Sequence, residues 1–179
     1  MPLLLNTVEP AYVFSDGNCL FRSVSIAYFG AVDWHDELRL RTAIEIGLHR
    51  DWYDKDASDY HFPFKDDARI KLSDYVTLCR DVAKSGTMSD VNTILALSAV
   101  IELPIQMYYP RLRGDLFEMP ELTRVVVGRG VNKEVGKVTI MWTTTGDIER
   151  VEDVVINHIV PLLKADKANS MTANDGRNV

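Results

Sequence analysis

The spacing of apolar residues changes once along the chain, close to Pro104, and this change constrains the fold more than any other feature. Four segments before it carry apolar residues at helical spacing: about Leu20–Gly30, Trp34–Trp52, Lys65–Lys84 and Val91–Ile101. Four short β-rich segments follow it: Ile105–Tyr109, Arg124–Val127, Val138–Trp142 and Ile156–Leu163. Helices first and strands later indicate an α+β fold, in which helices pack around a small, mostly antiparallel sheet.

Two of the helical segments allow more detailed expectations. The second is predicted to bury one face, made of Leu40, Ala43, Ile44, Gly47 and Leu48. The fourth, Val91–Ile101, is apolar nearly all round and is expected at the centre of the fold, with Ser89 as N-cap and Asp90 as a first-turn acid. Gly30 is predicted to end the first helix.

Length and composition indicate one domain. The chain has 179 residues, of which 46% are hydrophobic, which suits a single buried core. We expect a short N-terminal arm over residues 1–9, a domain over 10–164 and a disordered tail over 165–179, where small polar residues show no apolar period. The polar and aromatic stretch Asp51–Asp67 is predicted to be a surface loop.

Charge and composition also limit the partners. The net charge is −6 and no run of basic residues is present, so nucleic acid is not an expected partner. The apolar start Met1–Leu5 lacks a basic flank and is too short for a membrane anchor, so no membrane partner is expected.

Cysteine and histidine usage points to a reducing environment. Two cysteines are too few for a disulfide framework, which favours a soluble protein of an intracellular, cytoplasmic compartment. The four histidines have no metal-ligand spacing, so neither a metal nor a cofactor is expected. Cys79, on an apolar helix face, is predicted to belong to the core.

The stretch Asp16–Ser23 places Cys19 directly after a polar turn and directly before an apolar helix. The N–H groups of a helix N-terminus favour thiolate over thiol, and they can also bind an oxyanion. These properties suit a nucleophile. The alternative is that Cys19 is a small apolar residue packed under the helix.

His158 lies on the last predicted strand, within Asn157–Pro161. A cysteine protease needs a base within hydrogen-bond reach of its thiol. His158 can serve if this strand lies beside the helix of Cys19. The alternative is a half-buried strand histidine bonded to a backbone carbonyl.

Three segments together resemble the ovarian tumour (OTU) family of papain-like cysteine proteases, most of whose active members are deubiquitinases. Asp16–Ser23, D-G-N-C-L-F-R-S, is similar to the nucleophile motif of the family. Ser85–Tyr108 is similar to its glycine-containing loop, central helix and following strand, and Asn157–Leu163 to its terminal histidine strand. The resemblance spans about residues 10–163 and is greatest to OTU domains of viruses and mobile elements.

The resemblance implies roles for individual residues. Cys19 would be the nucleophile and His158 the general base, while Asp16 occupies a position that the family commonly counts with the catalytic group. For Asp16, turn formation through its own following amides is an equal alternative. The backbone N–H groups of Gly17, Asn18 and Cys19 would form the oxyanion hole, with glycine allowing backbone to approach the substrate carbonyl closely.

The last strand departs from the family pattern. The family usually has Asp or Asn two residues after the histidine, to orient the imidazole, and this chain has Val160 there. Ile156, on the same face, is also apolar, and alternation directs Asn157 to the other face unless a bulge intervenes. The residue orienting His158 must then come from another segment, such as Asp16 or a backbone carbonyl, or be absent.

The implied activity is that of a deubiquitinase, which cleaves after the C-terminal glycine of ubiquitin or a ubiquitin-like modifier through a Cys19 thioester. Trp142 is a candidate wall of the slot for the substrate tail, or else a core residue, and Trp52–Asp67 is a candidate recognition surface. Two alternatives stay open: a catalytically impaired ubiquitin-binding or protein-binding module, favoured by Val160, and a protease that processes a viral or transposon polyprotein.

Overall fold

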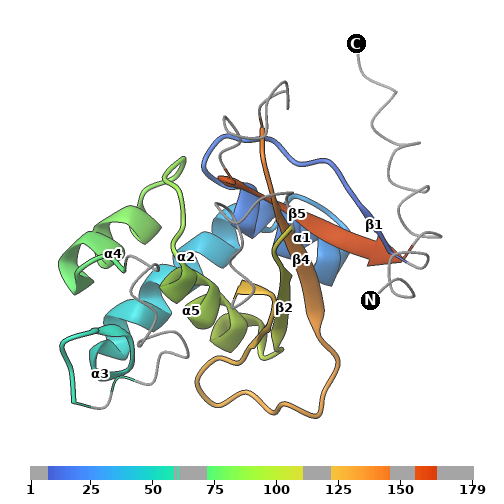
Figure 1. Cartoon of the computed structure of the whole chain (residues 1–179). Coiled ribbons are helices and arrows are strands. Elements are labelled where there is room, and N and C mark those ends of the chain that lie inside the picture. Colours follow the sequence, from blue (N-terminus) through green and yellow to red (C-terminus); the bar gives the residue numbers. More distant parts are fainter. Residues whose placement is uncertain (1–7, 59, 61–71, 111–121, 146–155, 165–179) are drawn as a thin grey trace.

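The computed structural model describes residues 8–58, 60, 72–110, 122–145 and 156–164, and Figure 1 shows the arrangement of the elements. Their order is β1 (Val8–Pro10), α1 (Cys19–Phe29), α2 (His35–Leu48), α3 (Arg50–Tyr53), α4 (Tyr75–Ala83), α5 (Val91–Ile101), β2 (Ile105–Tyr108), β3 (Val125–Val126), β4 (Val138–Thr143) and β5 (His158–Lys164). The predicted tail 165–179 lies outside the described residues.

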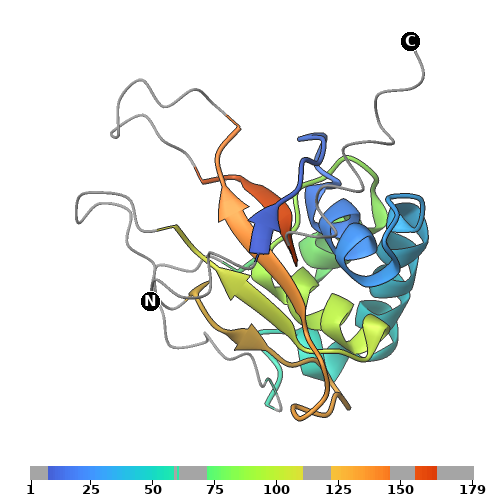
Figure 2. The same ribbon diagram turned by 90° about the vertical axis from the view of Figure 1, so that its right-hand side faces the viewer.

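The five described strands form one sheet in the order β1-β5-β4-β2-β3. Only the β2–β4 pair is parallel, and the other three pairs are antiparallel. Figure 2 shows the helices gathered on one side of this sheet. The predicted α+β class with a mostly antiparallel sheet is therefore confirmed. Strand β5, which carries His158, lies between β1 and β4.

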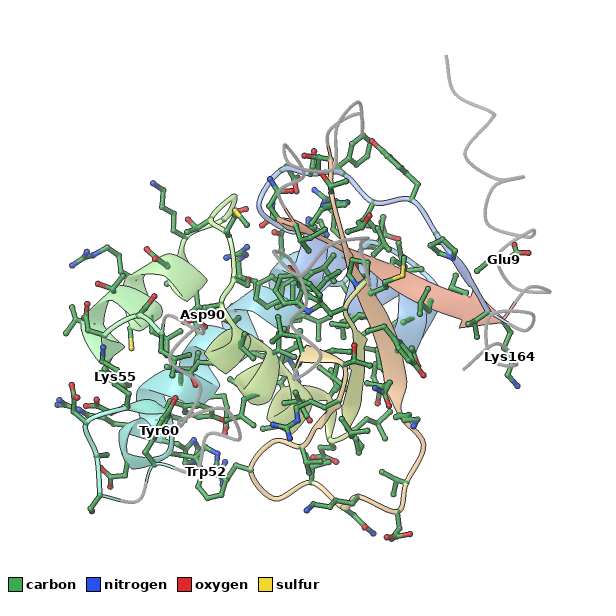
Figure 3. All side chains as sticks on the ribbon, in the orientation of Figure 1. Glu9, Trp52, Lys55, Tyr60, Asp90 and Lys164 are labelled. Carbon is green, nitrogen blue, oxygen red and sulfur yellow. The ribbon has the colours of Figure 1, made fainter. Side chains whose placement is uncertain are left out.

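The edge strand β1 was not predicted from the sequence. Val8, Glu9 and Pro10 pair with Lys164, Leu163 and Leu162 of β5. Figure 3 places Glu9 and Lys164 at this same edge. An edge is where a proline is tolerated in a sheet, because its missing N–H faces away from the partner strand.

Helices α1 and α5 agree with their predicted bounds. Helix α1 ends at Gly30, whose φ of 77° is the left-handed conformation expected of a C-terminal glycine. Helix α5 is buried along most of its length and central, as expected. Its N-cap, however, is Asp90, whose carboxylate accepts from the N–H of Thr93 at 3.0 Å. The assignment of Ser89 to that role was wrong.

Helix α2 buries a different face from the one predicted. Leu40, Ile44 and Leu48 are 57%, 51% and 73% exposed, so that expectation was wrong. The buried residues of α2 are Leu38, Arg39, Thr42 and Ile46. The predicted helix Trp34–Trp52 is also interrupted at His49, where the separate short helix α3 follows.

The third predicted helix is shorter than expected in its described part. Residues 72–74 are not helical, and α4 begins at Tyr75 after Asp74, whose carboxylate caps the N–H of Thr77 at 3.0 Å. Residues 65–71 lie outside the described chain. Cys79 packs against the core, as predicted. Among the described residues, no helix has both the length and the apolar character needed to cross a membrane.

Candidate active site

The start of α1 and the start of β5 are joined at one place in the fold. Ser23 donates its hydroxyl hydrogen bond to the carbonyl of Ile159 at 2.9 Å, a buried contact between positions 136 residues apart. The backbone of Ile159 also hydrogen-bonds the thiol of Cys19. Ile159 directly follows His158, so these bonds place the candidate nucleophile beside the strand of the candidate base.

The pairing of β5 explains why these contacts form. Strand β1 covers the edge of β5 only from Leu162 to Lys164. The backbone groups of Ile159 therefore need other partners, since an unpaired strand edge leaves N–H and C=O groups exposed. Helix α1 supplies them through Cys19 and Ser23.

Cys19 is the first residue of α1 and is 8% exposed. Burial raises the pKa of its thiol and the negative charge of Asp16 adds to this, whereas the backbone of Ile159, Leu20 and Cys19 itself acts in the opposite direction. A helix N-terminus alone would lower this pKa, but loss of hydration outweighs that effect here. The thiol is therefore protonated at neutral pH.

His158 is the first residue of β5 and is 6% exposed. Burial lowers the pKa of its imidazole, while a backbone hydrogen bond with Val13 and the charge of Asp16 oppose the shift. The imidazole is therefore neutral at neutral pH. Within the described chain no hydrogen bond joins it to the Cys19 thiol, and its Nδ1 has no partner.

The side chains beside His158 do not orient its imidazole, which is held by the backbone hydrogen bond with Val13. Val160 is buried and pairs with Met141 of β4. The side-chain oxygen Oδ1 of Asn157 is buried without a hydrogen-bond partner among the described residues, so it is not bound to the imidazole. Trp142 pairs with Ile159 in the sheet and is partly buried against the core.

The carboxylate of Asp16 is held by two groups of its own segment. It accepts from the N–H of Asn18 at 3.0 Å and forms an ion pair with Arg22 at 2.8 Å. The Arg22 hydrogen bond is the main reason that the pKa of Asp16 falls to about 2. Asp16 therefore shapes the turn and acts on Cys19 and His158 through its charge. The N–H of Asn18, one of the three predicted oxyanion donors, is occupied by this contact.

Gly17 lies against a second loop. Its φ is 79°, and a Cβ at this position would collide with the carbonyl group of Gly86. The side-chain Oδ1 of Asn18 reaches the same loop and accepts from the N–H of Gly86 at 3.1 Å and from Ser85 Oγ at 3.4 Å. Glycine is therefore required at position 17 because the backbone approaches Gly86 closely. The sequence had instead suggested a close approach to the substrate carbonyl as the reason for this glycine.

Two exposed aromatic side chains precede the turn. Tyr12 and Phe14 are 74% and 60% exposed, with ring centroids 5.5 Å apart, and Val13 between them is buried. Sequence reasoning did not single out these residues, nor Arg22, which belongs to the nucleophile motif. Among the residues that the structure describes, no three His, Cys, Asp or Glu side chains gather into a metal-binding group.

Comparison with known proteins shows which domains this chain is similar to. A family model described as the OTU domain of Vertnin matches residues 10–76. No curated protein matches the sequence significantly. Among solved structures, the OTUD1 OTU domain has a TM-score of 0.56 and 19% identity, with 88% of this chain and 86% of that chain covered.

Viral structures are similarly close. The OTU protease of Taggert virus has a TM-score of 0.56 at 15% identity, with 90% of this chain and 83% of that chain covered. The Hazara virus OTU, solved bound to ubiquitin, has a TM-score of 0.54 at 11% identity, with 89% and 83% covered. At these identities the likeness shows the fold. The family-model match covers the nucleophile turn and the helices that follow it, and the fold of the chain is that of an OTU domain.

Proposed function

We propose that this protein is a cysteine-type deubiquitinase, which hydrolyses the peptide or isopeptide bond after the C-terminal glycine of ubiquitin or a ubiquitin-like modifier. The observation that carries the proposal is the contact between the Cys19 thiol and the backbone of Ile159, next to His158, in an OTU fold. We also propose an intracellular, cytoplasmic location, because the nucleophile must stay reduced.

The neutral thiol and neutral imidazole define the first step. His158, in the form that can accept a proton, takes the proton of the Cys19 thiol as the sulfur attacks the glycine carbonyl. The S–C bond forms, the C–N bond breaks, and the proton passes from His158 to the leaving amine. Water activated by His158 then cleaves the thioester, which frees the carboxylate of the modifier and regenerates the thiol.

Ubiquitin is proposed as substrate for two reasons. The fold is similar to that of the Hazara virus OTU, which was solved bound to ubiquitin. The tail of ubiquitin ends in two glycines, and a chain without side chains is the kind that a narrow passage beside a nucleophile of 8% exposure would admit. Trp142 stays a candidate for the wall of that passage.

The stretch Trp52–Asp67 is proposed to contact the folded body of the modifier. Figure 1 shows α3 at the far end of the helical layer from the start of β5, and Figure 3 places Trp52 and Tyr60 in that region. Such a position suits recognition of a globular surface better than of the extended tail. Residues 59 and 61–67 of this stretch lie outside the described chain.

A ubiquitin probe with a C-terminal electrophile tests this proposal. We expect a covalent adduct with the wild-type chain, seen as a mass increase, and none with Cys19→Ala. Cys79→Ala is the matched control and should react like the wild type, because Cys79 lies in the core on α4. An adduct that persists in Cys19→Ala, or folded wild-type protein that forms none, contradicts the hydrolase proposal.

A second candidate function is binding of ubiquitin without cleavage. It is favoured by the raised pKa of Cys19, which burial causes, and by the His158 Nδ1, which lacks a partner within the described chain. The same experiment separates the two functions. Saturable binding of unmodified ubiquitin by a wild-type chain that forms no probe adduct would support the binding module.

A further inference from the structure

Arg39 is a buried arginine at the centre of the contacts around the nucleophile turn. It lies on α2 and is 4% exposed. Its Nη2 donates to the carbonyls of Gly17 at 2.8 Å and Thr87 at 2.9 Å. Its Nη1 donates to the carbonyls of Lys84 at 2.9 Å, Val82 at 3.2 Å and Asp81 at 3.4 Å.

The guanidinium is also fixed by an aromatic ring of α1. Its central carbon lies 4.4 Å from the centroid of Phe21. Arg39 therefore joins the nucleophile turn, the end of α4, the 84–87 loop and α1. A planar fork of donors suits such a site, whereas an ammonium group does not reproduce it.

The contact with Gly17 acts directly on the turn. A peptide unit is planar, so a fixed Gly17 carbonyl also fixes the N–H of Asn18 in the same unit. The side chain of Asn18 is held by the 84–87 loop at the same time, through Gly86 and Ser85. Cys19 follows immediately, so the direction of its side chain depends on these two attachments.

The charge of Arg39 has a second effect. Burial lowers the pKa of Arg39, and the negative charges of Asp36, Asp16 and the Cys19 thiolate oppose this shift. The guanidinium is thus close enough to attract the thiolate. Asp16 has the opposite effect, since its carboxylate disfavours ionisation of the thiol.

We propose that Arg39 is a positioning residue, whose guanidinium fixes the Gly17 carbonyl to the 84–87 loop and so aims Cys19 at the scissile carbonyl. The effect on turnover rests on the proposed hydrolase function. The effect on thiol reactivity does not, because it needs no substrate.

Two variants and one control test the turnover effect. Arg39→Lys keeps the charge but loses most of the five carbonyl contacts, and Asn18→Ala removes the second attachment. Arg41→Lys is the control, because Arg41 lies on the same helix with a 65% exposed side chain paired to Glu37. The kcat and KM for a fluorogenic ubiquitin amide are measured per active site, titrated with the electrophilic probe.

We expect Arg39→Lys to lower kcat per titrated site about 10²-fold, with KM changed less than about threefold, because a misplaced nucleophile affects the reaction more than binding. Asn18→Ala should change kcat in the same direction, and Arg41→Lys should match the wild type. A purely structural role would reduce the number of titrated sites and leave kcat per site unchanged. That result, in either variant, overturns the proposal.

A second measurement needs no substrate. Alkylation of Cys19 by iodoacetamide, in a Cys79→Ser background, should be about fivefold slower in Arg39→Met than in Arg41→Met, because the charge that attracts the thiolate is lost. Equal rates in the two folded variants contradict the proposal. If wild-type protein shows no turnover, the hydrolase function fails, but this comparison still decides the role of Arg39.

Discussion

At the scale of single residues, Gly17 is the position in the candidate site that leaves no space for a side chain. Its φ of 79° favours glycine, and the carbonyl of Gly86 occupies the space that a Cβ would need. Gly130 has a similar φ of 74°, but a Cβ added there would meet nothing within 4 Å. Comparing a substitution at Gly17 with one at Gly130 therefore distinguishes the cost of backbone strain from the cost of a steric clash.

Gly17→Ala should destabilise the protein more than Gly130→Ala. A left-handed φ costs a non-glycine residue about 1–2 kcal/mol, which is the whole expected effect at Gly130. At Gly17, displacement of the 84–87 loop should add about 1–3 kcal/mol. The free energy of unfolding in urea measures both. Equal losses in the two variants would show that the contact with Gly86 has no energetic consequence.

The individual residues also show what sequence can predict about such a site. The motif Asp16–Ser23 placed Cys19 at the junction of a turn and a helix, because turn and helix signals are local, and the helix begins at Cys19 itself. The direction of the Cys19 pKa shift was not predictable, since it depends on burial by segments distant in sequence. The ion pair of Asp16 with Arg22 lies within the motif, but a separation of six residues across the start of a helix does not predict it.

At the scale of elements, the attachment of α1 to β5 positions the candidate nucleophile against the candidate base. Ser23 is fully buried and provides one of the two bonds to Ile159. Ser25 is equally buried but donates to Ala31, in the loop after α1, and has no part in this attachment. The two serines form a matched pair on one helix.

Ser23→Ala and Ser25→Ala should both lower the free energy of unfolding, by about 1–3 kcal/mol, because each leaves a carbonyl without its donor. Ser25→Ala also leaves the N–H of Trp34 without its acceptor. Only Ser23→Ala should also slow formation of the ubiquitin-probe adduct, by about tenfold, because it loosens Cys19 relative to His158. The rate of adduct formation is measured by quenching the probe reaction at successive times and determining the adduct fraction by mass spectrometry. Similar slowing in both variants would contradict a specific role for the α1–β5 attachment.

Helix α2 shows where periodicity fails. The pattern of Leu40, Ile44 and Leu48 predicted the buried face because it counts apolar residues, and those residues are exposed. The face that is buried contains Arg39, which the core accepts because carbonyls satisfy its guanidinium. Such compensation depends on the tertiary structure and cannot be read from spacing along one helix.

At the scale of the whole molecule, the candidate site lies between the helical layer and the sheet. The nucleophile opens the first helix and the base opens the last strand, which is held between β1 and β4. The order of helices and strands was enough to predict the class of this fold. The strand β1 could not be predicted in this way, because a segment of three residues that ends in a proline carries no strand signal of its own.

The central claim is that Cys19 and His158 together hydrolyse a ubiquitin amide, and the pH dependence of kcat/KM for a fluorogenic ubiquitin amide tests it most directly. Neutral His158 is the required base, and burial lowers its pKa from the ordinary value of 6.5. Activity should therefore persist as the pH falls through 6.5 and decline only at lower pH. His158→Ala should lose about 10²-fold or more of the rate, and Cys19→Ala all of it. A wild-type chain without turnover, or a His158→Ala variant as active as the wild type, would contradict the account.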